Sequence, residues 1–196
     1  MTREPRIPCD GAALPALAEQ KLALRKELLA RRRALDPALK AAWDARIAAH
    51  LLAWRRDAQA AVIGVYWPLA GEPDLMDAYD ALAREGVRLA LPVVLERDAP
   101  LGFADWVPGE AMMKDAMGVA VPQLLRAVVC PPVLLVPCLG FNGERFRLGY
   151  GGGYYDRTLA LMPRPVTVGV AYASLAAEFA SAAHDVALDF IITEAA

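Results

Sequence analysis

The chain opens with two stretches whose apolar residues recur at helical spacing. In residues 21–35 leucines repeat on one face, while Lys21, Arg25 and Arg32 fall on another. Asp36 can then accept the first free amides of a second helix that has Pro37 in its first turn. Apolar residues continue this second pattern at Trp43, Ile47, Leu51 and Trp54. We therefore expect two successive amphipathic helices, the first with a basic stripe.

Beyond these helices, short apolar runs rich in β-branched residues alternate with helical patterns. The runs predict buried strands at residues 60–67, 87–94, 101–106, 133–138, 166–172 and 190–193. Further helices are expected from a cap at Asp74 to Gly86, over residues 154–162, and from a cap at Ser174 to residue 181. This alternation predicts a largely parallel sheet covered by helices, with ligands beyond the carboxyl ends of the strands.

Length and composition indicate one folded domain. The chain has 196 residues, of which 57% are hydrophobic and 22% charged, and such a mixture favours a packed core over disorder. Residues 1–20 are interrupted by prolines, so we expect a loosely ordered extension there and a single domain at residues 21–196.

Charge and cysteine usage narrow the class of protein. The net charge of -2 creates no global positive field for nucleic acid or an anionic membrane, so an anion site has to be local. Cys9, Cys130 and Cys138 lack CxxC spacing, which fits free thiols in a reducing compartment. We find no secretory signal, and the apolar stretch at 127–139 is too short to cross a bilayer. We expect a soluble, cytoplasmic monomer that acts on small molecules and binds neither nucleic acid nor membrane.

The most informative segment is a buried strand followed by a glycine-rich loop, LLVPCLGFNGERFRLGYGGGYYDRTL at residues 134–159. Glycine lets backbone amides approach a ligand closely, and together with the start of the following helix such amides form a concavity suited to phosphate oxygens. The glycines are Gly149, Gly151, Gly152 and Gly153. Fixed positive charge around them comes from Arg145, Arg147 and Arg157.

This loop matches neither of two common phosphate motifs. It lacks the Gly-Lys-Ser/Thr of a Walker A loop, and the GxGxxG pattern fails because Tyr154 stands where glycine is needed. A glycine cluster alone is also compatible with a flexible turn. Asp156 either complements the helix dipole or binds magnesium, which needs only one or two protein carboxylates when phosphate and water complete its coordination. Asp185 and Asp189 are candidate partners for it.

The sequence RLGYGGGYYDR at residues 147–157, with LLVPCLGF before it, resembles the signature of the 5-formyltetrahydrofolate cyclo-ligase family, also called methenyltetrahydrofolate synthetases. Other pieces follow in the family's order. They are KLALR with Lys21 and Arg25, YWPLAGEPD with Glu72, and then VGVAY and HDVALDFIITE. The resemblance covers nearly everything after Lys21.

The resemblance implies a fold and a reaction. The fold is a three-layer α/β sandwich, Rossmann-like and similar to the NagB/RpiA/CoA-transferase group, with a largely parallel central sheet and helices on both faces. The reaction uses ATP and Mg2+ to turn 5-formyltetrahydrofolate into 5,10-methenyltetrahydrofolate. Phosphorylation of the formyl oxygen gives an iminophosphate that N10 attacks, with release of phosphate, so the protein supplies positioning and charge stabilisation.

The resemblance also implies roles for individual residues. ATP is expected to contact Lys21, Arg25, Arg147, Leu148, Gly149, Tyr150, Gly151, Gly152, Gly153, Tyr154 and Tyr155. The folate is expected to contact Glu72, Trp106, Tyr150, Gly151, Gly152, Gly153 and Tyr154, with Glu72 accepting hydrogen bonds from the pterin. Catalysis falls to Arg147, Tyr154 and Asp156, and magnesium binding to Asp156 and Asp185.

Simpler interpretations remain open for several of these residues. A basic helix stripe is commonly solvated, Glu72 fits an ordinary loop glutamate, and aromatic residues such as Trp67 and Trp106 are more often part of a core. His50 and His184 have no cysteine cluster nearby and do not indicate zinc.

Two positions depart from the family pattern. Asn142 stands where many members carry aspartate, and GVAVPQ at residues 118–123 lacks a glutamate before its proline. These departures leave room for a paralogue that binds folate or nucleotide and regulates without turnover. A third interpretation, an RNA-binding accessory protein that uses the arginine-rich first helix, conflicts with the acidic net charge. We expect an active enzyme.

Overall fold

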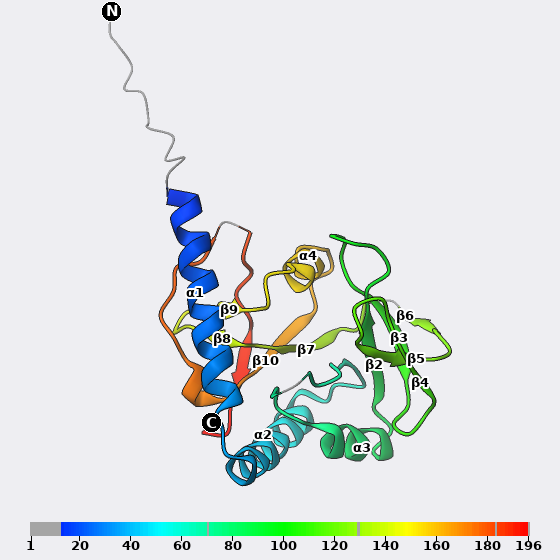
Figure 1. Ribbon diagram of the computed structural model, residues 1–196. Helices are drawn as coiled ribbons and strands as arrows, with labels where there is room; N and C mark the ends of the chain where they lie inside the picture. Colours follow the sequence, from blue (N-terminus) through cyan, green and yellow to red (C-terminus); the bar gives the residue numbers. More distant parts are fainter. Residues whose placement is uncertain (1–12, 70, 129, 183, 196) are drawn as a thin grey trace, which may run out of the picture.

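The computed structural model describes residues 13–69, 71–128, 130–182 and 184–195 (Figure 1). Expectations that fall on residues 1–12, including Cys9, lie outside this part of the chain. In the described ranges, no helix has both the length and the apolar character that crossing a membrane requires.

The structure is organised around a seven-stranded sheet in the order β11-β10-β7-β1-β2-β3-β6. These strands are β1 (Val62–Gly64), β2 (Arg88–Val93), β3 (Gly102–Trp106), β6 (Ala127–Val128), β7 (Val133–Pro137), β10 (Val166–Val170) and β11 (Phe190–Ile192). The five strands from β11 to β2 are parallel, and β3 and β6 each pair antiparallel with their neighbour. The predicted largely parallel sheet is therefore confirmed.

Helices cover both faces of this sheet. They are α1 (Ala13–Arg33), α2 (Pro37–Ala58), α3 (Met76–Arg84), α4 (Tyr154–Leu159) and the 3-10 turn η1 (Ala173–Leu175). Successive residues of a strand point to opposite faces. In β7, Leu135 packs in one cluster with residues of α1, α2 and α3, whereas Leu134 and Val136 pack in a second cluster with Leu159 of α4. The α/β architecture expected from the sequence is confirmed.

Local signals placed the start of α2 and the end of α3 correctly. The predicted cap of α3 at Asp74 is wrong by one position, since Leu75 is the N-cap, although the Asp74 carboxylate accepts from the amide of Met76. The Asp36 carboxylate accepts hydrogen bonds from the amides of Ala38 and Leu39 and so caps α2. Gly86 follows α3 at a φ of 81°, a left-handed conformation that glycine adopts without steric cost. Helix α1 begins earlier than the leucine pattern indicated, at Ala13 rather than near Lys21.

Two predicted helices differ from the structure. The helix expected at residues 174–181 is wrong, because only η1 forms before Ala176 turns extended and forms a bridge with Phe141. The amide of Ala177 also donates to the carbonyl of Phe141, so tertiary pairing replaces the helix. Helix α4 ends at Leu159 instead of residue 162, in keeping with the bias of a residue before proline, here Pro163, away from helical geometry.

Two small hairpins were not recognised in the sequence. One pairs β4 (Met112–Lys114) with β5 (Ala120–Pro122), and the other pairs β8 (Gly140–Phe141) with β9 (Arg147–Leu148). Strands of two or three residues are too short to give an alternation pattern. The second hairpin matters most here, since β9 leads directly into the glycine-rich loop.

Candidate active site

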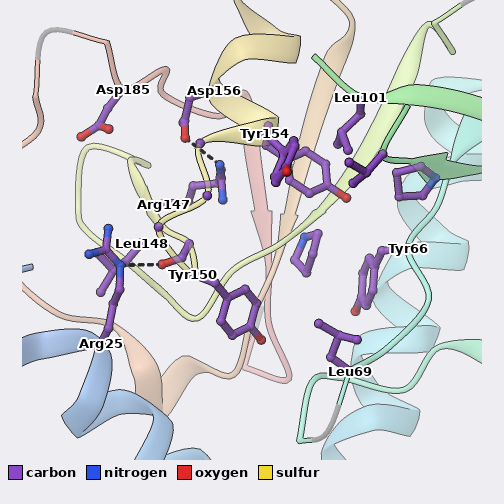
Figure 2. Close-up of a pocket in the computed structure, with 18 of the residues that line it drawn as sticks. Arg25, Tyr66, Leu69, Leu101, Arg147, Leu148, Tyr150, Tyr154, Asp156 and Asp185 are labelled. Atoms are coloured by element: carbon purple, nitrogen blue, oxygen red, sulfur yellow. Dashed lines mark hydrogen bonds and ion pairs between the residues drawn. The ribbon is translucent and has the colours of Figure 1, made fainter. Parts of the chain in front are cut away.

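A cleft of about 790 Å³ opens at the carboxyl ends of the parallel strands. Its walls include Trp67 after β1, Val94 after β2 and Pro137 at the end of β7, together with α1 and the glycine-rich loop. Figure 2 shows charged residues such as Arg147 and Asp156 toward one end and apolar residues such as Leu69 toward the other. Ligands were expected beyond the carboxyl ends of the strands, and this is where the cleft lies.

The glycine-rich loop, residues 149–153, directs its amides away from the protein's own acceptors. No backbone amide of this loop donates to another residue in the described part of the chain. Its carbonyls, in contrast, are held: Arg25 Nε donates to the Gly149 carbonyl at 2.8 Å and Arg157 Nη2 to the Gly152 carbonyl at 2.6 Å. Because the carbonyl and the N–H of a trans peptide point in opposite directions, these bonds turn the following amides outward.

Two glycines of the loop hold backbone conformations that disfavour other residues. Gly151 has a φ of 95° and Gly153 a φ of 65°, both in the left-handed region. A Cβ at Gly151 would meet the guanidinium of Arg25 at 3.7 Å, which is an ordinary contact. A larger residue is therefore disfavoured at this position by the backbone conformation and not by lack of space. The sequence prediction that these glycines shape the loop is consistent with this geometry.

Two ion pairs lie at the charged end of the cleft. Arg147 Nη2 donates to Asp156 Oδ2 at 2.9 Å, and the guanidinium of Arg147 also stacks 5.1 Å from the ring centre of Tyr155. Lys21 pairs with Asp185, and both side chains are largely buried. Two of the side chains predicted to bind phosphate, Arg147 and Lys21, are thus paired with the two predicted metal ligands.

Asp185 is held in its ionised form. Removal from water is the strongest single influence and acts to raise its pKa, but the Ala182 amide and the Lys21 ammonium group together lower the pKa below its ordinary value of 3.8. The carboxylate accepts from both donors through Oδ2. Among the described residues, no group of three His, Cys, Asp or Glu side chains is placed to hold a metal by itself.

The other end of the cleft is apolar and aromatic. The side chains that form it are Tyr66, Trp67, Leu69, Pro92, Val94, Leu101, Met117 and Val119. Met117 lies at the tip of the β4–β5 hairpin, and its sulfur accepts a hydrogen bond from the Tyr154 hydroxyl at 3.9 Å. A flat, partly aromatic ligand matches this surface in chemistry.

Glu72 lies between the two ends and is 2% exposed. One of its oxygens accepts from the amide of Leu69 at 2.8 Å, and the other accepts from the hydroxyl of Tyr150 at 2.5 Å. Tyr150 in turn accepts from Arg32 Nη2 at 2.6 Å. Burial and then the neighbouring Glu72 raise the pKa of Tyr150, so this phenol stays neutral and keeps a proton to donate.

Several residues singled out in the sequence lie away from the cleft. Trp106 is 2% exposed and packs in the core between Trp67 and Tyr79, so Trp67 instead of Trp106 meets the ligand space. Arg145 occupies an exposed turn, and Asp189 bonds to Thr167. These three positions share a strand or motif with site residues, but neither spacing nor motif specifies which face they occupy.

The side chain of Leu148 is buried below the loop, and its carbonyl accepts from the amide of Leu139. Leu148 therefore supports the glycine-rich loop from the core side. The apolar residues of the hairpin tip, such as Met117, gave no signal in the sequence because their approach to Tyr154 is a long-range contact. Arg32 did have a signal, since it belongs to the same helical stripe as Lys21 and Arg25.

Asn142 has a local structural role. Its Oδ1 accepts from the amides of Glu144 and Phe146, and its Nδ2 donates to the carbonyl of Phe179 at 3.1 Å. The side chain therefore closes the turn between β8 and β9 and ties it to a neighbouring segment. An aspartate there could not donate to the carbonyl of Phe179. Asn142 is not among the residues that line the cleft.

Comparison with known proteins agrees with the motif. The family model described as the 5-formyltetrahydrofolate cyclo-ligase family matches residues 17–194. A 5-formyltetrahydrofolate cyclo-ligase of Mycoplasma pneumoniae is 30% identical over 177 residues, covering 89% of this chain and 98% of the relative. The Escherichia coli K12 protein of the same description is 31% identical over 148 residues, covering 73% and 81%.

Solved structures give the same similarity. The 5,10-methenyltetrahydrofolate synthetase of Mycoplasma pneumoniae superposes with a TM-score of 0.75 at 30% identity, over 89% of this chain and 98% of that one. The 5,10-methenyltetrahydrofolate synthetase of Aquifex aeolicus superposes with a TM-score of 0.77 at 27% identity, over 89% of each chain. The similarity therefore extends over the whole domain and is not restricted to the loop.

The ion pair of Asp185 predicts a pH dependence of stability. Because its folded-state pKa is lowered, Asp185 stabilises the fold above its ordinary pKa of 3.8, and this contribution disappears as the pH falls through the lower folded-state value. Asp185→Asn should thus unfold at lower urea concentration than the parent near neutral pH, and the difference should shrink in strong acid. Glu96→Gln, at an exposed position without an ion pair in the described ranges, is the control and should show no such convergence. A difference for Asp185→Asn that stays constant from neutral to strongly acidic pH contradicts the prediction.

Proposed function

Because this chain belongs to the 5-formyltetrahydrofolate cyclo-ligase family, we propose that its cleft joins ATP hydrolysis to the cyclisation of 5-formyltetrahydrofolate into 5,10-methenyltetrahydrofolate. The observation that carries the proposal is the division of the cleft. One end has loop amides with no acceptor among the described residues, beside cationic side chains, and the other is lined by aromatic and aliphatic groups. A reaction between a triphosphate and a flat heterocycle requires both ends in one cavity.

The chemistry assigns a task to each end. The formyl oxygen of the folate attacks the γ-phosphorus of ATP, the bond to ADP breaks, and an iminophosphate forms. N10 then attacks the activated carbon, phosphate leaves with the former formyl oxygen, and N10 loses its proton. The protein has to hold the two substrates in line and stabilise charge on the transferred group, without forming a covalent bond of its own.

The loop amides at residues 149–153 and the side chains of Lys21, Arg25 and Arg147 would bind the phosphates. The amides are suited to this because Arg25 and Arg157 hold the carbonyls of the loop on the opposite side. Arg147 is fixed by Asp156 and by the ring of Tyr155, so its guanidinium is already oriented before a ligand enters. Donors fixed in advance stabilise developing negative charge without reorganising during the reaction.

The donor set also fits magnesium. Asp156 and Asp185 are hard oxygen ligands, and each bonds through Oδ2 to a cationic side chain. This leaves Oδ1 of Asp156 for an ion, whereas Oδ1 of Asp185 lies 3.8 Å from His184 Nε2, which an ion would have to displace. Mg2+ commonly takes one or two protein carboxylates, with phosphate and water as its other ligands. When bound, the ion would neutralise charge on the phosphate oxygens.

The folate would occupy the apolar end, with its ring system against Tyr66, Trp67 and Leu101. Glu72 is a polar group in reach of that end, and its carboxylate can accept hydrogen bonds from the N–H groups of the pterin. Its fixed orientation suits recognition, because both oxygens are already held in place. Tyr154, between the two ends, would contact the reacting groups.

We place the enzyme in the cytoplasm and expect it to act as a monomer. Cys130 and Cys138 are free thiols, as is usual in a reducing compartment, and this supports the cytoplasmic location.

A direct assay tests the proposal. The protein is mixed with 5-formyltetrahydrofolate, ATP and Mg2+, and formation of the methenyl product is followed by its absorbance, with phosphate release as a second readout. We expect one phosphate per methenyl product. If both ligands bind but no product forms, the protein is a binding regulator and not an enzyme. Weak folate binding with salt-sensitive RNA binding would instead favour the accessory role.

Substitution of a loop glycine tests the phosphate site. Gly151→Ala forces a side chain into a left-handed backbone conformation at a strain of about 1–2 kcal/mol, so the loop should shift and the KM for ATP should rise about tenfold. Gly109→Ala is the matched control, since Gly109 has a similar φ of 88° in a turn outside the cleft. Equal KM values for ATP in the two variants would place the phosphates elsewhere.

Asp156→Asn tests the proposed metal ligand. Loss of the charged oxygen should lower kcat roughly 100-fold and weaken the dependence of the rate on magnesium concentration. Asp189→Asn is the control, because Asp189 also pairs with an arginine, Arg164, but lies outside the cleft. Circular dichroism checks that both variants fold. A variant Asp156→Asn with the parent's rate and magnesium response would show that the assignment is wrong.

A further inference from the structure

Three side chains from distant parts of the sequence form a chain of hydrogen bonds in which Tyr150 and Glu72 line the cleft and Arg32 lies behind them. Arg32 Nη2, near the end of α1, donates to the Tyr150 hydroxyl at 2.6 Å. That hydroxyl donates to Glu72 Oε1 at 2.5 Å. Figure 2 shows Tyr150 between the charged and the apolar ends of the cleft. None of the steps assigned to the reaction above needs the Tyr150 hydroxyl.

The direction of these bonds follows from the groups involved. A guanidinium can only donate and an ionised carboxylate can only accept, whereas a phenol does both. Arg32 therefore occupies an acceptor site of the Tyr150 hydroxyl and leaves its proton for Glu72. Arg32 is 2% exposed, and its guanidinium carbon lies 5.6 Å from the ring centre of Tyr150, so it holds the ring as well as the hydroxyl.

The backbone of Tyr150 belongs to the loop proposed to bind phosphates, whereas Glu72 is bonded to Leu69, a residue of the proposed folate end. The second Glu72 oxygen is held by the amide of Leu69, so a movement of the carboxylate is opposed from both sides. The Tyr150 hydroxyl is thus a direct mechanical link between the two proposed ligand sites. The two groups that hold the Tyr150 hydroxyl, Arg32 and Glu72, are each 2% exposed, although Tyr150 itself is 45% exposed. Hydrogen bonds to ionised groups of this kind are among the stronger ones in proteins.

We propose that Tyr150 is a positioning residue that couples nucleotide binding to folate binding, and that Arg32 holds it in place. The inference rests on the proposed function for the identity of the two ligands. A folate that donates hydrogen bonds to Glu72 fixes the carboxylate, and through it Tyr150 and the loop. Folate thereby restricts further a loop whose carbonyls Arg25 and Arg157 already hold, so less conformational entropy is lost when the nucleotide binds. Coupling of this kind is reciprocal.

Ligand affinities measured in pairs test the coupling. The Kd of 5-formyltetrahydrofolate is determined by titration calorimetry with and without a non-hydrolysable ATP analogue and Mg2+. In the parent the analogue should tighten folate binding by about fivefold or more, the lower end of usual couplings between sites. In Tyr150→Phe, which keeps the ring and removes the hydroxyl, the ratio of the two Kd values should fall to about one. Retention of the parent's ratio in this variant overturns the proposal, as does a parent ratio of one.

Tyr172→Phe is a matched control. The Tyr172 hydroxyl donates to Asp44 at 2.6 Å, so this substitution also removes a tyrosine-carboxylate bond, but from a site outside the cleft. It should lower stability and leave the ratio of Kd values unchanged. If Tyr172→Phe abolished the coupling as fully as Tyr150→Phe does, the effect would come from general loosening of the fold and the proposal would be wrong.

The role of Arg32 is tested by non-additivity. Arg32→Met removes the donor to Tyr150 and should lower the coupling about as much as Tyr150→Phe. The double variant should lower it no further, because both changes break the same chain. Full coupling in a folded Arg32→Met protein would contradict its part in the proposal.

Turnover in the same preparations separates this inference from the proposed function. A parent that binds both ligands with coupling but forms no methenyl product contradicts the reaction and leaves the coupling established. A parent that forms product, while Tyr150→Phe keeps the parent's ratio of Kd values, contradicts the coupling alone.

Discussion

The site depends above all on the hydrogen bond from Arg25 to the carbonyl of Gly149. It links α1 to a loop that follows it by more than a hundred residues and holds one carbonyl of that loop on the side of the helix. Arg157 does the same from the other end, at Gly152. With these two carbonyls held, the amides of Tyr150 and Gly153 point to the opposite side of their peptide units. The two arginines would thus act on the proposed phosphate site by orienting the backbone as well as by their charge.

Two cationic groups of the cleft are paired directly with an acid, and Arg32 behind it reaches a third acid through a tyrosine. Arg147 pairs with Asp156, Lys21 pairs with Asp185, and Arg32 reaches Glu72 through Tyr150. Pairing keeps partly buried charges in place before a ligand arrives. It also explains how a chain with a net charge of -2 could hold the proposed anion site. The carboxylates and the phosphates of a bound nucleotide would share one magnesium ion.

The departure at Asn142 has a simpler explanation than loss of activity. Its amide group both accepts from the turn and donates to the carbonyl of Phe179, a combination that aspartate lacks. The second departure, around Val121, lies in a buried position of the β4–β5 hairpin. Neither position changes the groups at the charged end of the cleft. The observations that favoured a regulator without turnover therefore concern local folding.

The sequence alone determined what depends on local pattern: the helix capped by Asp36, the strands around β7 and β10, and the largely parallel sheet. It also singled out the glycine-rich loop, which lines the cleft. Tertiary structure decided which side chains meet. Lys21 with Asp185, Arg32 with Tyr150, and the removal of Trp106 into the core are contacts between segments far apart in the chain. Periodicity reports the face of an element on which a residue lies. It cannot report which other element packs against that face, because that is set by the packing of the whole domain.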